Sequence, residues 1–140
     1  MIGLVVSLAI ATILAIVASR LLGLFLVKGD SMLPTLREGE WVLARRRFFG
    51  ERPCNRQIMI LLRREFPPVL IKRVVASPGE AVPTDAPVAQ ANVPDGCYLL
   101  AGDNPSLHPQ ARWIGPVSRN DIWGMAFLVV WPWRRLRRVV

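Results

Sequence analysis

An apolar run at the amino terminus is the feature that most constrains this chain. No charged residue occurs from Ile2 to Ser19, and after Arg20 the apolar sequence resumes from Leu21 to Val27. About 20 apolar residues span a bilayer core, and one arginine near an end can extend its charge to the headgroups. Apolar residues occupy every face of this run, which disfavours a buried core helix. The sequence therefore predicts a transmembrane anchor over residues 1–27.

A cleaved secretory signal is the alternative for this run. The run lacks a basic n-region and is long for the apolar part of a signal peptide. Once the anchor is set aside, about 110 residues remain, which is the size of one small domain with a single core. We therefore expect a β-rich domain over residues 28–133, followed by a basic tail over residues 134–140.

The positive charges near the anchor bear on membrane sidedness. Arg20, Lys28, Arg37 and the run from Arg45 to Arg47 all follow the apolar segment, and only the amino terminus precedes it. Positive flanks favour the cytoplasmic side. Taken alone, this rule keeps the domain in the cytoplasm.

The net charge of +8 raises the question of an anionic partner. No zinc-finger spacing, RNA-binding aromatic strand or helix-turn-helix pattern accompanies the charge, so no nucleic acid is predicted. The tail from Trp131 to Arg138 reads WPWRRLRR, and tryptophan beside arginine is typical of a headgroup interface. The lipid bilayer is the predicted partner, and a solvated basic tail is the alternative.

The two cysteines, Cys54 and Cys97, have no CxxC or metal-binding spacing. They are compatible with one disulfide in an oxidising compartment or with two free thiols. The sequence predicts no metal and no organic cofactor.

Past the anchor the chain alternates between short apolar runs and turn-forming residues. Val, Ile, Leu and Trp dominate the runs, whereas Pro, Gly, Asp and Asn separate them. The pattern predicts a mostly β domain, with the Ala/Pro-rich segment 81–95 as an excursion from it. The predicted strands are Trp41–Ala44, Ile58–Leu62, Val69–Ala76, Cys97–Ala101 and Trp123–Trp131.

Ser31 lies in a Gly-flanked loop directly after the anchor, and its chemistry depends on a base. A serine hydroxyl is a weak nucleophile until a base takes its proton, and the usual base is a histidine held by a carboxylate. The one histidine, His108, lies in a turn-like stretch, which disfavours such a triad. Lysine can act as the base when burial lowers its pKa. Lys72 interrupts an apolar strand-like segment beside Arg73, and alternation directs these two side chains to opposite faces.

Each of these residues also has an ordinary structural interpretation. A lysine on an edge strand discourages aggregation, and Gly-Asp-Ser is common turn chemistry. Neither Ser31 nor Lys72 is decisive by itself.

The loop around Ser31 resembles the nucleophile box of type I signal peptidases. Residues 29–36 read GDSMLPTL, similar to the S-M-x-P-T-L box, with Pro34 at its proline position as a structural residue. The resemblance implies that Ser31 is the nucleophile and that its backbone N–H contributes to the oxyanion hole. It also implies that Met32 lines the substrate cleft. Gly29 and Asp30 complete the box before the serine, and Gly29 stands where some members carry a hydroxyl.

Two later segments resemble further boxes of the same family, in the family's order. Residues 71–79 read IKRVVASPG, which implies that Lys72 is the general base, next to Arg73. Residues 101–104 read AGDN, followed by RWIGPV at 112–117. This third region implies structural roles for Gly102, Asp103, Asn104 and Arg112.

The resemblance has consequences for fold and activity. It implies a signal-peptidase-like β catalytic core behind one transmembrane helix, with the catalytic domain outside the cytoplasm. This location conflicts with the charge rule above. It further implies a serine endopeptidase with a Ser/Lys dyad that removes leader peptides from precursor proteins.

The chain departs from the family pattern after the GDN turn. His108 stands where the family has a serine hydroxyl that orients the lysine, and Gln110 replaces the carboxylate that would pair with Arg112. An imidazole can accept a hydrogen bond from an amine. His108 and Ser106 are therefore both candidate lysine orienters.

The short connection from Glu80 to Tyr98 leaves no room for the extra subdomain of larger signal peptidases. The chain thus resembles compact members, including maturation peptidases associated with nickel superoxide dismutase or with conjugation pili. A non-catalytic protein that binds leader peptides or lipid on the same scaffold is the alternative from another class.

Overall fold

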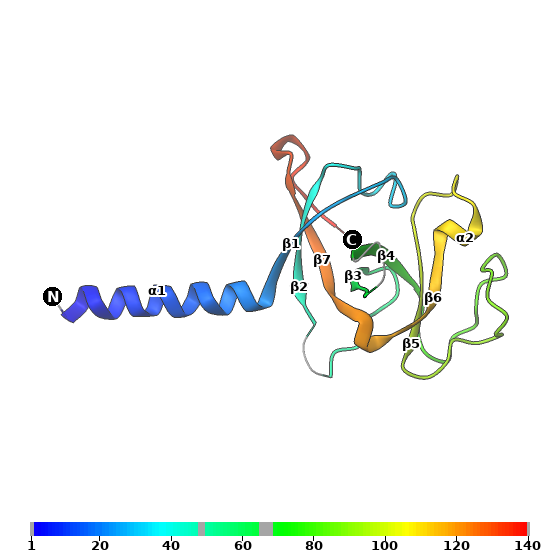
Figure 1. Cartoon of the computed structure of the whole chain (residues 1–140), viewed down its shortest axis with the longest axis horizontal. Coiled ribbons are helices and arrows are strands. Elements are labelled where there is room, and N and C mark those ends of the chain that lie inside the picture. The colour runs from blue at the N-terminus through cyan, green and yellow to red at the C-terminus, as the bar shows by residue number, and fades with distance from the viewer. Residues whose placement is uncertain (1, 48–49, 65–68, 140) are drawn as a thin grey trace.

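A single long helix extends away from a compact β domain in the computed structural model, which describes residues 2–47, 50–64 and 69–139 (Figure 1). Helix α1 covers Ile2–Leu21. Within it, Gly3–Leu21 has a mean hydropathy of 2.3, and none of this stretch is buried against the domain. Its length and composition suffice to cross a bilayer.

The apolar segment expected to form one anchor over residues 1–27 is divided in the structure. Helix α1 ends at Leu21, and Leu22–Leu26 form strand β1, which pairs with β2. Residues Leu22, Leu24 and Leu26 are exposed, whereas Gly23 and Phe25 are half-buried, so this part follows the two-residue period of a strand. Because the sequence is apolar on both sides of Leu21, it does not indicate where the helix ends and the strand begins.

The domain is built on one eight-stranded sheet in which every pairing is antiparallel. The strand order is β1-β2-β7-β3-β4-β5-β6, and β8 pairs with β7 outside this path. After β1, the strands are β2 Trp41–Arg46, β3 Ile58–Leu62, β4 Val69–Ala76, β5 Cys97–Ala101, β6 Trp113–Ser118, β7 Ile122–Trp131 and β8 Arg137–Arg138.

The prediction of a mostly β domain behind one apolar helix is confirmed. All the predicted strands are present, and their ends agree with the expected ends to within a residue or two. The sequence did not reveal β6, because Gly115 and Pro116 interrupt its apolar pattern. It also did not reveal β8, because arginines do not give a strand signal.

Buried side chains from loops and strands form the core in three clusters. One cluster joins Met32 and Leu36 of the Ser31 loop to β2, β3 and β7. A second joins β3, β4, β5, β6 and β7, and a third packs β5 against the segment 81–95. That segment is closed by backbone hydrogen bonds from Val82 to Ala91 and from Gly79 to Val93. Cys54 and Cys97 are both free thiols in the structure.

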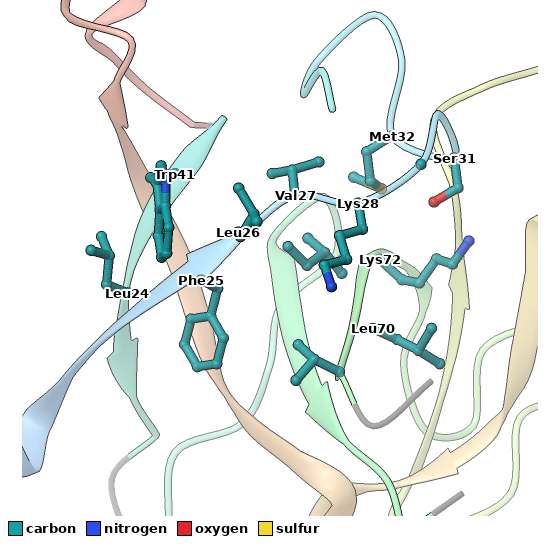
Figure 2. Close-up of a pocket in the computed structure, with 13 residues that line it drawn as sticks. Leu24, Phe25, Leu26, Val27, Lys28, Ser31, Met32, Trp41, Leu70 and Lys72 are labelled. Atoms are coloured by element: carbon teal, nitrogen blue, oxygen red, sulfur yellow. The ribbon is translucent and has the colours of Figure 1, made fainter. Parts of the chain in front are cut away.

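The sheet curls, so that strands far apart in its order line one cavity. Residues of β1, at one edge, and of β4, four positions along, both line a cavity that also contains Ser31 and Lys72. Figure 2 shows this cavity between the two strands.

Candidate active site

The loop that carries Ser31 follows β1 and is held by its own apolar side chains. Met32 is 2% exposed and Leu36 is fully buried. The loop turns through Gly29, whose φ of +74° belongs to the left-handed region that favours glycine. Backbone hydrogen bonds from Leu33 to Asp30 and from Leu36 to Met32 close the turns. Ser31 is therefore half-buried at the start of a loop with a fixed backbone.

Lys72 lies on β4 with its side chain inside the domain. Only 4% of it is exposed, although lysine is rarely buried without a partner. Burial lowers the pKa of the Lys72 amine, and the negative charges of Asp103 and Asp30 only partly offset this effect. Burial thus shifts the equilibrium toward the neutral amine, the form that can accept a proton.

Gly102 is the point at which the Ser31 loop and Lys72 meet. A Cβ atom at Gly102 would lie 2.3 Å from the backbone oxygen of Ser31 and 3.2 Å from Nζ of Lys72. Both atoms therefore lie beside the Gly102 backbone, and no larger residue fits between them. Figure 2 shows the Ser31 hydroxyl and the Lys72 amine directed toward the same space.

Among the described residues, no hydrogen bond joins the side chains of Ser31 and Lys72. The serine hydroxyl rotates about one bond, and catalytic hydrogen bonds are often long before substrate binds. The structure therefore places the buried Lys72 amine near the Ser31 loop, without a hydrogen bond between the two side chains.

Asn104 tethers the Ser31 loop to the rest of the domain. Its backbone N–H donates to the Ser31 carbonyl at 3.1 Å, and its side-chain Nδ2 donates to the Asp30 carbonyl at 3.1 Å. Its Oδ1 accepts from the backbone N–H of Ser106 at 3.0 Å. The GDN turn, residues 102–104, therefore holds the peptide groups on both sides of Ser31.

Arg73, the residue after the lysine, points to the other face of β4, as alternation requires. Its Nε and Nη2 donate to the two carboxylate oxygens of Asp103 at 2.8 and 2.7 Å, and Nη1 donates to the Arg56 carbonyl. Two parallel bonds of this kind fix orientation as well as charge. The pair thereby joins β4 to the GDN turn.

Arg112 has a carboxylate partner that the sequence did not indicate. Asp85, in the segment 81–95, accepts from Nη1 of Arg112 at 3.3 Å, and Nε donates to the Gly102 carbonyl at 3.2 Å. Asp85 thus takes the pairing role that Gln110 cannot provide. The bond to Gly102 connects Arg112 to the GDN turn.

The two candidate lysine orienters are both exposed. His108 precedes helix α2, Pro109–Arg112, and its Nδ1 accepts from the backbone N–H of Gln110 at 3.4 Å. In the described part of the chain, neither His108 nor Ser106 forms a hydrogen bond with Lys72. The charges that act on Lys72 instead belong to Asp103 and Asp30.

The cavity beside Ser31 and Lys72 is a mostly apolar cleft of about 460 Å³. Gly29 and Met32 line it, whereas the exposed Asp30 does not. One basic side chain, Lys28, also lines it and extends into it in Figure 2. Sequence reasoning missed this lysine. The remaining apolar lining comes from Leu24, Phe25, Leu26, Val27, Trp41, Val69, Leu70 and Ile71.

The basic tail expected over residues 134–140 is partly folded onto the domain. Arg135 and Arg137 both pair with Glu40, which is 2% exposed, and Arg137 also donates to the Thr35 carbonyl of the Ser31 loop. Trp133 and Leu136 remain exposed. Within the described residues, no cluster of His, Cys, Asp or Glu is arranged to hold a metal ion.

Comparison with known proteins identifies the family of this chain. The sequence model of the family described as "Signal peptidase, peptidase S26" matches residues 1–88, which include Ser31 and Lys72. This match covers more than half of the chain. The chain therefore belongs to the signal peptidase family, peptidase S26.

The mitochondrial inner membrane protease subunit 2 of Saccharomyces cerevisiae is a relative of this chain. The two are 34% identical over 118 residues, a match that covers 76% of this chain and 66% of the yeast protein. The chain thus spans just under two thirds of that relative. Together with the candidate span in α1, the relative supports a membrane protein.

Proposed function

We propose that this chain is a membrane-anchored serine endopeptidase in which Ser31 is the nucleophile and Lys72 is the general base. The observation that carries the proposal is the position of the Lys72 amine. It is buried, its pKa is lowered, and it lies with the Ser31 backbone against Gly102 in one apolar cleft. Catalytic bases are characteristically found in such perturbed sites.

The chemistry follows from a neutral amine beside a hydroxyl. Lys72 Nζ accepts the Ser31 proton while Oγ bonds to the scissile carbonyl carbon, and the carbonyl electrons move to its oxygen. Collapse of this intermediate breaks the C–N bond, and the Lys72 ammonium returns the proton to the departing nitrogen. Water then attacks the acyl ester with the same amine as base, which releases a carboxylate and restores Ser31.

The backbone N–H of Ser31 is the proposed donor to the oxyanion. Among the described residues, it donates to no other group. The tether from Asn104 holds the Ser31 carbonyl and so fixes the orientation of this loop. A donor fixed in advance, aimed at the developing charge, is worth several kcal/mol in related chemistry.

The proposed substrates are precursor proteins with a leader or pro-peptide. β1 is an edge strand of the sheet and lines the cleft, so an extended peptide can pair with its free side. The short 81–95 loop supports a compact enzyme, which includes single-substrate maturation as well as general leader removal. A cleft that begins where α1 ends suits cleavage close to the membrane.

We place the catalytic domain on the extracytoplasmic side, in accord with family membership. The arginines and lysine that follow α1 argue for the opposite side. A reporter fused after Val140, active on one side of the membrane only, tests this assignment. Activity of a cytoplasmic reporter would overturn it.

The central test is cleavage of a leader-bearing precursor by the full chain in detergent. Ser31→Ala and Lys72→Met are each expected to lower kcat by at least about a thousandfold. Ser106→Ala is the matched control, because its exposed hydroxyl forms no hydrogen bond among the described residues, and it should retain activity. Unchanged cleavage in either dyad variant would contradict the proposal. Binding of precursor without cleavage by the unaltered chain would favour the non-catalytic alternative.

A further inference from the structure

A second cavity, lined by arginines, shares no lining residue with the cleft beside Ser31. It has a volume of about 660 Å³, and its polar lining includes Arg46, Arg47, Arg119, Asn120 and Asp121. None of these residues lines the cleft beside Ser31. We call this cavity the arginine pocket.

The charge of the arginine pocket is positive. Asp121 is the one carboxylate in its lining, against three guanidinium groups. The nearby carboxylate of Glu51 is paired with Arg45 through two hydrogen bonds. A neighbouring cavity, which shares Asp121 and Leu62 with the pocket, adds Arg63 and Arg64.

Two of the arginines are positioned by the backbone of Glu51 rather than by a carboxylate. Arg47 and Arg119 both donate to the Glu51 carbonyl. Their Nε atoms are buried and have no acceptor in the described part of the chain. Buried donors of this kind ordinarily have an acceptor. Planar guanidinium groups held in this way suit the oxygens of a phosphate.

The arginine pocket lies beside the end of the membrane helix. Trp123 forms part of its wall, and a Cβ atom on Gly23 would lie 2.5 Å from the Trp123 ring. Gly23 is the second residue after α1. In the sheet, Leu22 is paired with Arg45, the residue before Arg46. In Figure 1 the end of α1 accordingly meets β1 and β2.

We infer that the arginine pocket binds the phosphate of an anionic phospholipid headgroup. A helix that crosses the bilayer ends at headgroup depth, and the Gly23–Trp123 contact places the pocket within one side chain of that end. The exposed Leu62 in the same wall offers an apolar surface to the glycerol and upper acyl chain. This inference depends on the membrane anchor and holds whether or not Ser31 is a nucleophile.

Native mass spectrometry of the full chain in detergent tests the inference directly. Titration with phosphatidylglycerol or phosphatidylcholine gives a dissociation constant for the first bound lipid. We expect phosphatidylglycerol to bind at least about tenfold more tightly, because each arginine near a headgroup contributes roughly fivefold. Equal affinity for the two lipids would overturn the inference.

Substitutions of single arginines test whether the lipid binds in the arginine pocket. Arg46→Gln removes an exposed side chain with no hydrogen bond among the described residues, so the fold should be retained. It should weaken phosphatidylglycerol binding roughly fivefold, and Arg46→Gln with Arg119→Gln should bring it close to the phosphatidylcholine value. Arg52→Gln is the matched control, since Arg52 is an exposed arginine in the connection that follows β2 and lies outside the pocket. Thermal unfolding of each variant checks that the fold is intact.

Two outcomes would show that the arginine pocket does not bind a lipid headgroup. If Arg138→Gln, in the carboxyl-terminal segment, abolishes the lipid preference and Arg46→Gln does not, the tail binds lipid and the inference is wrong. If millimolar inorganic phosphate displaces phosphatidylglycerol and binds equally well without lipid, the pocket takes a soluble anion, which also overturns the lipid assignment. Retained phosphatidylglycerol binding at that phosphate concentration supports it.

Discussion

Glu40 and Arg137 lie 97 positions apart in the sequence and are joined by an ion pair of 3.1 Å. Glu40 is buried in the connection between the Ser31 loop and β2, and Arg135 reaches the same carboxylate at 2.8 Å. Arg137 also donates to the Thr35 carbonyl. The carboxyl-terminal segment therefore clamps the far end of the loop that carries Ser31.

Replacement of Glu40 by glutamine should open this clamp. The variant leaves two arginines without their shared carboxylate, and we expect a loss of about 2–3 kcal/mol in the free energy of unfolding. Arg138→Gln is the matched control, because Arg138 is exposed on β8, and it should change stability by less than about 0.5 kcal/mol. Chemical denaturation in detergent measures both. Equal effects of the two substitutions would contradict the clamp.

The clamp should also weaken in acid. Burial by itself would raise the pKa of Glu40, but hydrogen bonds from Arg137 and the Arg37 N–H, with the charges of Arg137 and Arg135, outweigh it and lower the pKa. The folded state therefore holds this proton less tightly than the unfolded chain. Its stabilisation is present above the unfolded value of about 4.3 and is lost as pH falls through the folded pKa. The stability difference between the unaltered chain and Glu40→Gln should shrink over that range.

Gly102→Ala should inactivate the enzyme without removing any catalytic group. The added Cβ would lie 2.3 Å from the Ser31 backbone oxygen, so the loop or the GDN turn must move. A displacement of about 1 Å can lower kcat about a hundredfold. Gly3→Ala, whose Cβ would have no atom within 4 Å, is the control and should leave cleavage unchanged. Full activity of Gly102→Ala would show that the close approach has no functional role.

The pH dependence of activity should reveal the buried amine. Burial lowers the pKa of Lys72 despite the opposing charges of Asp103 and Asp30. The rate of cleavage should rise with pH and reach its plateau below the free-lysine value of about 10.4. A rate that still climbs at that pH would indicate a solvated base. Initial rates measured from pH 5 to pH 11 decide the matter.

Lys72→Met should stabilise the protein at neutral pH while it abolishes cleavage. Because the unfolded chain binds the Lys72 proton more tightly than the folded one, stability rises with pH between the folded and unfolded pKa values. Below the folded pKa this penalty is fully present, and methionine removes it while it keeps the volume of the side chain. Denaturation of the unaltered chain and of Lys72→Met from pH 6 to pH 11 should show that the difference between their free energies of unfolding decreases as pH rises.

Asn104→Ala tests the tether of the Ser31 loop. It removes the side-chain bonds to the Asp30 carbonyl and the Ser106 N–H, and it leaves the backbone bond to Ser31. We expect a loss of about 1–2 kcal/mol in stability and a fall in kcat larger than the change in KM. Asp85→Ala is the comparison, because its exposed pair with Arg112 should contribute less than about 1 kcal/mol. A change in KM alone would place Asn104 in substrate binding instead.

The sequence by itself determined the candidate groups for the proposed chemistry and the repeating local patterns. An apolar run without a polar stripe indicated α1, and short alternating runs indicated β2, β3, β4, β5 and β7. Lys72 was visible because it interrupts an apolar strand, whereas Ser31 lies among ordinary turn residues and was singled out by the resemblance of its loop to a known motif. Strand alternation placed Lys72 and Arg73 on opposite faces, but only the structure shows that Lys72 is the buried one.

Tertiary structure decided everything that joins distant segments. Leu22–Leu26 is apolar enough to continue the helix, and only its pairing with β2 makes it a strand. No spacing in the chain encodes the Asp85–Arg112 pair, the clamp on Glu40 or the arginine pocket. Periodicity reports which face of one element is buried, whereas an ion pair or a cavity depends on which elements lie side by side.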